Sequence, residues 1–133
     1  NGVMVVNMSM RGSGEGNINQ YLSDTIASVF GTVYTADVKG STNRELFASD
    51  NPQILQVLQD NEKKLQSKDL EQMMGTVLAG CTPYEAGSYI MTDDKAPVEL
   101  LGMKVIDQLI QDEVVYYKDI YHEEGIKGVM DHL

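Results

Sequence analysis

The fold is decided by the apolar run Gly2-Val3-Met4-Val5-Val6-Asn7-Met8, which opens the chain. A run without alternation between apolar and polar residues is typical of a strand that is buried on both faces of a sheet. Such a strand needs a neighbour on each side, yet it stands first in this sequence. We therefore expect residues 2–8 to form an inner strand of a larger sheet, of which this chain carries only a part.

The next residues predict a helix and two more strands. A glycine-rich turn at 11–16 leads into residues 17–30, where apolar side chains recur at helical spacing and Asn17 can cap the first turn. Residues 32–38 and 43–49 are strand-like, and the four residues between them are too few for a parallel crossover. The last strand should therefore run antiparallel. The expected apolar stripe of the helix is Ile18, Tyr21, Leu22, Ile26, Val29 and Phe30.

The rest of the chain reads as helices. Pro52 and the polar residues before it indicate a helix start, a second short helix ends near Gly80, and a long one runs from Val98 and stops before Gly125. These patterns predict an α/β protein in which residues 1–50 form the sheet part and residues 51–133 are mainly helical. We expect residues 1–133 to be a single domain or a fragment of one.

Composition excludes several classes of function. The net charge of −10, most of it after residue 66, disfavours nucleic-acid binding. The single Cys81 allows no intrachain disulfide and no four-cysteine zinc site, and His122 has no second ligand at helical spacing, so no metal is expected. No apolar run approaches the roughly 20 residues of a membrane helix. A cytoplasmic location fits, with a membrane attachment expected only through an N-terminal region outside this sequence.

Four segments carry a family resemblance. GVMVVN, YLSDTIASVFGTVYTADV and NRELFASDNP, followed later by MTDDKAPVE, resemble in order and spacing the C-terminal half of spermidine synthase-like proteins, the polyamine aminopropyltransferases. The resemblance implies the C-terminal half of a Rossmann-like, S-adenosylmethionine-dependent methyltransferase fold. Three strands of that fold would lie in this chain, with the last one inserted antiparallel between the other two, and several helices would pack on them.

The resemblance also implies what this chain lacks. The cofactor, S-adenosylmethionine or its decarboxylated form, would bind the other half of the parent protein, which would also carry the catalytic aspartate. We expect no cofactor site here, no activity for this part alone, and no assignable catalytic residue. Whether the parent is an active aminopropyl- or methyltransferase stays open. The turn Gly12-x-Gly14-x-Gly16 imitates a dinucleotide loop but has the wrong spacing, so a connecting role is favoured.

Five residues are candidates for the side of the site that binds the small-molecule acceptor. Asn7 and Arg11 lie near the end of the first strand, and Thr92, Asp93 and Asp94 follow the last apolar run before the long helix. Adjacent aspartates can bind a cation or act as a base, but they can equally cap a helix. Arg11 and Lys39 disfavour a cationic polyamine, so an anionic or neutral acceptor is at least as well supported.

An alternative is a non-catalytic module for dimerisation or regulation that keeps the sheet and has lost the chemistry. In either case the strand at residues 3–8 would present an unpaired apolar edge, and such edges pair with other chains. The sequence therefore predicts either a homo-oligomer formed through the edge Val3–Met8 or partial disorder of the N-terminus.

Overall fold

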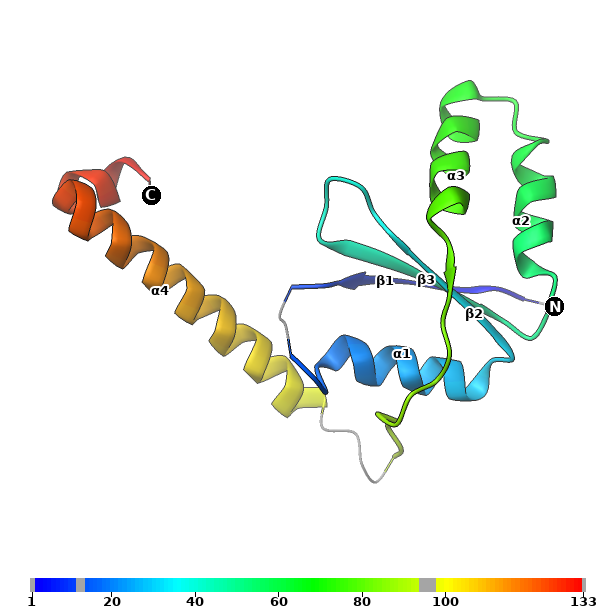
Figure 1. The fold of residues 1–133 in the computed structure, drawn as a ribbon, viewed down its shortest axis with the longest axis horizontal. Helices are drawn as coiled ribbons and strands as arrows, with labels where there is room; N and C mark the ends of the chain where they lie inside the picture. Colours follow the sequence, from blue (N-terminus) through cyan, green and yellow to red (C-terminus); the bar gives the residue numbers. More distant parts are fainter. Residues whose placement is uncertain (1, 12–13, 94–97, 133) are drawn as a thin grey trace. The chain divides into compact units, whose positions relative to one another are not determined.

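The computed structural model describes residues 2–11, 14–93 and 98–132. The chain divides into two compact units, residues 1–96 and residues 97–133 (Figure 1). The first unit contains, in order, β1 (Met4–Ser9), α1 (Ile18–Val29), β2 (Thr32–Asp37), β3 (Asn43–Ser49), α2 (Ile54–Glu62), α3 (Lys68–Gly80) and β4 (Thr82–Pro83). The second unit contains α4 (Val98–Asp131). The predicted α/β class is confirmed.

The sheet has four strands in the order β1-β3-β2-β4, and every neighbouring pair is antiparallel. The three predicted strands are present, and β3 inserts antiparallel between β1 and β2, as the resemblance implied. The two-residue β4 was not predicted. It is held to β2 by a bond from Tyr84 N to Val33 O (2.9 Å) and by the Thr82 hydroxyl, 3.3 Å from Thr35 O.

Helix α1 covers one face of the sheet, here called the α1 face. Asn17 caps the helix as predicted, because its Oδ1 accepts a bond from Gln20 N at 3.0 Å. Ile26 is buried there, together with Leu46 and Ala48 of the central strand, which are both 0% exposed. Val29 was expected on the buried stripe, but it is 72% exposed. The buried stripe instead includes Asn19, Ser23 and Asp24, which are polar.

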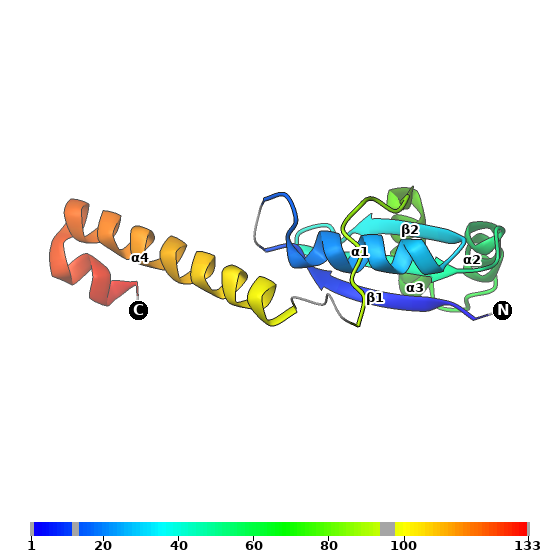
Figure 2. The ribbon, with the colours of Figure 1, turned by 90° about the horizontal axis from the view of Figure 1, so that it is seen from below.

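Helices α2 and α3 lie over the opposite face, the α2/α3 face, so the unit has three layers; Figure 2 views them from the side of α1. Phe47 and Ala36 are buried against Ile54, which is 2% exposed. The alternation of Leu46 and Phe47 to opposite faces is the two-residue period of a strand. Burying each of these large side chains stabilises the fold by roughly 1.5–3 kcal/mol.

The prediction that the opening strand is buried on both faces is wrong for the residues that the structure describes. Met4, Val6 and Met8 pack on the α1 face, but Val3 and Val5 are 48% and 55% exposed. The reason is that α2 and α3 pack over β2 and β3, where Phe47, Tyr34 and Ala36 lie, and leave β1 uncovered. One face of β1 therefore carries exposed valines.

Residues 84–91, here called the strap, follow β4 and bind to α1. The Asp24 carboxylate, 1% exposed, accepts bonds from the Tyr84 hydroxyl (2.7 Å) and from Tyr89 N (3.0 Å). Met91 N donates to Thr25 Oγ1 at 2.8 Å. The Tyr89 ring packs edge-on against Tyr21, 5.1 Å between centroids. A buried carboxylate is stable only when it is hydrogen-bonded, and the strap supplies those bonds.

The second unit is the helix α4. The sequence predicts a helix that stops before Gly125, and the chain does break there: Gly125 has φ 72° and ψ −167°, and a further helical segment follows. Large apolar side chains along α4, such as Ile106 and Ile110, each 56% exposed, face solvent within the unit. Tyr116 and Tyr121 are also exposed. No described helix is both long and apolar enough to cross a lipid bilayer.

Gly87 lies where the strap packs against Asp24, so a substitution at this position tests that contact. A Cβ atom added there would lie 2.5 Å from Asp24 Oδ2, so the strap or the helix must shift. We expect Gly87→Ala to lower the free energy of unfolding by about 1–3 kcal/mol, measured by urea titration. The control is Gly80→Ala, since no heavy atom lies within 4 Å of a Cβ at that position. Equal stability of the two variants would contradict this packing.

Asp24 should make stability depend on pH. Burial alone would raise its pKa, but the bonds from Tyr84, Tyr89 and Gly87 outweigh burial, so the pKa lies below the usual value. A lowered pKa stabilises the folded state above the unfolded pKa of about 4, and this contribution is lost as the pH falls through the folded pKa. Thermal unfolding should therefore show less acid destabilisation for Asp24→Asn than for the exposed control Glu71→Gln. Parallel pH profiles for the two variants would contradict the role of Asp24.

Candidate functional site

A depression of about 660 Å³ lies where β1 ends beside the β2–β3 turn, and we call it the turn pocket. Its lining residues are small or polar, apart from one arginine: Ser9, Arg11, Gly40, Ser41, Thr42 and Asn43. The two sides of the pocket are joined by a backbone bond from Met10 N to Thr42 O at 2.7 Å. Gly40, with φ 77°, closes the turn in a conformation that glycine adopts without strain.

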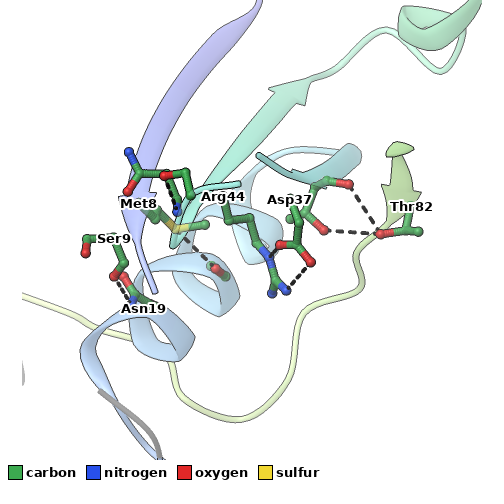
Figure 3. Close-up of polar contacts among 10 residues, drawn as sticks. Met8, Ser9, Asn19, Asp37, Arg44 and Thr82 are labelled. Atoms are coloured by element: carbon green, nitrogen blue, oxygen red, sulfur yellow. Dashed lines mark hydrogen bonds and ion pairs between the residues drawn. The ribbon is translucent and has the colours of Figure 1, made fainter. Parts of the chain in front are cut away.

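An ion pair lies beside this pocket on the α1 face. Arg44 Nε is 2.6 Å from Asp37 Oδ1, and a second guanidinium nitrogen is 3.2 Å from Oδ2, so the pair is bidentate (Figure 3). The bond to Arg44 lowers the pKa of Asp37, and the same bond raises the pKa of Arg44. Arg44 lies opposite Met8 in the sheet register and opposite Asp37 on the other side. The arginine is therefore occupied by a partner on the neighbouring strand.

A smaller cavity of about 170 Å³ opens on the α1 face next to Arg44, with Asn19, Gln20 and Tyr84 in its wall. The Asn19 side chain donates to Ser9 O at 2.7 Å and so fixes the end of β1 to the helix. Burial, together with the bond to Asp24, raises the pKa of Tyr84 to about 12, so this hydroxyl stays protonated at neutral pH. The Tyr84 hydroxyl donates its hydrogen bond to Asp24.

The structure describes four of the five candidate residues. Asn7 is exposed and pairs with Glu45 in the register of β1 and β3, whereas Arg11 lines the turn pocket. Thr92 and Asp93 are exposed and follow the strap, which binds α1 at Thr25. Asp94 lies outside the described residues. Among the described residues, no hydrogen bond or ion pair joins Thr92 or Asp93 to Asn7 or Arg11.

The glycine-rich turn contacts other residues of the chain through Gly16. Gly14 and Gly16 have φ values of 124° and 70°, which glycine adopts readily. Gly16 N donates to Gln20 Oε1 at 2.8 Å, and the Tyr89 ring approaches so closely that a Cβ on Gly16 would lie 3.0 Å from it. The Gly16 amide is thus taken up by Gln20, and the residue has a packing role.

The described part of the chain holds no cluster of metal-ligating side chains, and its cysteine is half-buried. Residues 2–11, 14–93 and 98–132 hold no group of three or more histidine, cysteine, aspartate or glutamate residues that could bind a metal ion. Cys81 is half-buried against the cluster around Ile54, and burial raises the pKa of its thiol. A raised pKa lowers the thiolate fraction and hence nucleophilicity.

Sequence reasoning missed the residues that organise this region, namely Asp24, Arg44 and Tyr84. Asp24 and Tyr84 bond to each other and are 60 residues apart in the sequence. Arg44 and its partner Asp37 are 7 residues apart. One signal was present: Asn19 and Ser23 are small polar residues four apart on the same side of the helix as Ile26, which indicates a polar patch within the packed stripe.

Comparison with known proteins finds one similar curated protein. The chain is 44% identical over 146 aligned positions to a probable polyamine aminopropyl transferase of Bifidobacterium longum (strain NCC 2705). The match includes 97% of this chain and 33% of the relative, so the chain spans about a third of the relative's length. No family model matches the chain, and no solved structure matches it significantly. The resemblance seen in the sequence is thereby confirmed: the chain is similar to part of a protein named as a polyamine aminopropyl transferase.

Proposed function

We propose that this chain is the C-terminal part of a spermidine synthase-like transferase that uses S-adenosylmethionine or its decarboxylated form. The observation that carries the proposal is the 44% identity to an aminopropyl transferase across 97% of the chain. The strand order supports it, because β3 lies antiparallel between β1 and β2, as in the C-terminal half of a Rossmann-like methyltransferase fold.

The chemistry would divide between the two parts of such a protein. A sulfonium makes the carbon beside it electrophilic, so the enzyme must align an acceptor nucleophile and let it lose a proton. This chain would supply the acceptor side, where Arg11 and the turn pocket lie at the end of β1. The sulfonium cofactor would bind the remaining part.

The same proposal accounts for β1. Its outer edge has no strand partner among the described residues, and Val3 and Val5 are half-exposed. Another strand of the longer protein would pair with this edge, and further residues would cover the valines. β1 would then have the two buried faces that its composition predicts.

A calorimetric experiment tests whether the cofactor binds the remaining part of the protein and not this chain. S-adenosylmethionine and its decarboxylated form are titrated into the 133-residue chain and into a longer protein that has the relative's full length. We expect saturable binding by the longer protein only. Tight binding by the 133-residue chain would overturn the proposal. Binding by neither protein would favour the alternative, a non-catalytic dimerisation or regulatory module.

The open edge of β1 leads to a second prediction for the 133-residue chain. We expect two copies to pair through this edge, because unpaired apolar edge strands associate. Val5→Lys places a charge on the exposed face of β1 and should shift the chain to monomer in sedimentation velocity. The control Val29→Lys changes a 72% exposed valine on α1 and should leave the dimer intact. A monomeric wild-type chain would contradict this prediction.

A further inference from the structure

The turn pocket differs from the rest of this acidic chain in the charge of its lining. The chain has a net charge of −10, yet the described residues that line the pocket include one arginine and no carboxylate. Lys39 precedes this stretch of the turn, and Arg44, whose charge is balanced by Asp37, follows it. An anion would therefore meet less repulsion here than over the acidic helices.

The two arginines of this region are in different states. The Arg44 guanidinium is held by Asp37 with bonds of 2.6 and 3.2 Å. Arg11 is exposed and makes no ion pair or hydrogen bond with any described residue. A guanidinium offers five donors in a planar fork that matches a carboxylate or phosphate group. Arg11 keeps that fork available to a ligand.

Three residues with hydroxyl side chains line the turn pocket together with Arg11. Ser41 Oγ accepts a bond from Asn43 N at 3.1 Å, so its own proton remains free to donate into the pocket. The hydroxyl groups of Ser9 and Thr42 make no bond with other described residues. Hydrogen bonds from neutral hydroxyls to an ionised oxygen are stronger than those to a neutral acceptor.

Backbone hydrogen bonds hold the turn pocket in place without a ligand. Met10 N bonds to Thr42 O at 2.7 Å, Val38 N to Asn43 O at 2.9 Å, and Ser41 N to Val38 O at 3.1 Å. A ligand would thus meet donors on a closed hairpin turn, and little backbone ordering would be required on binding.

From this geometry we infer that the turn pocket binds an oxyanion, the carboxylate or phosphate group of a small molecule, with Arg11 as its principal contact. The binding itself is independent of the proposed transferase function.

The test is a titration of the isotope-labelled 133-residue chain, followed by amide NMR shifts at constant ionic strength. Inorganic phosphate and acetate are the anionic probes, and spermidine is the cationic one. We expect saturable shifts at residues 9–11 and 40–43 with an anion. Saturation by phosphate alone assigns a phosphate group, and saturation by acetate as well assigns any carboxylate or phosphate.

Two variants identify the contact. Arg11→Gln removes the guanidinium at an exposed position and should weaken anion binding about tenfold, since a hydrogen-bonded charge pair contributes roughly that factor. Lys64→Gln removes one positive charge from an exposed site at the end of α2 and should leave the affinity unchanged. Absence of saturable shifts with both anions, equal weakening by both variants, or saturation by spermidine alone would overturn the inference. A failure of the proposed transferase function would appear separately, in the cofactor titration.

Discussion

The first unit depends on the pairing of β3 with a strand on each side. β3 shares six residue pairs with β1 and six with β2, and its Leu46 and Ala48 are completely buried. Leu46 packs with α1 and Phe47 with α2, so this strand joins the two helical layers. A slip of one residue would turn Leu46 away from α1 and Phe47 towards it, which makes the register strongly determined.

A buried charge organises the other long-range connection. Asp24 lies in the middle of α1 at 1% exposure, and an ionised carboxylate there is tolerated only because Tyr84 and Tyr89 donate to it. The strap is therefore fixed to the helix by polar contacts at Asp24 and Thr25 and by the contact between Tyr89 and Tyr21. Gly87 is required where the strap backbone meets the carboxylate.

The relationship to an aminopropyl transferase gives these features a context. The chain spans about a third of that relative, and its sheet has one edge strand with half-exposed valines. The β2–β3 turn and the end of β1 form a polar pocket that contains an arginine without a partner among the described residues. We therefore propose that ligand recognition takes place at this end of the sheet. The strap and the core beneath it have structural roles.

The sequence by itself determined the elements and their local order. Apolar runs, the Asn17 cap, the short turn after residue 38 and Gly125 indicated the three main strands, the helices and the break in α4, because these signals act between residues close in the chain. Only the tertiary structure decided which faces are buried. The exposure of Val3, Val5 and Val29, the burial of Asp24 and the pairing of β4 all depend on which distant segments pack together. The same applies to the site. Arg11 could be identified from its position after a strand, but the ion pair between Arg44 and Asp37 forms only when β2 and β3 lie side by side.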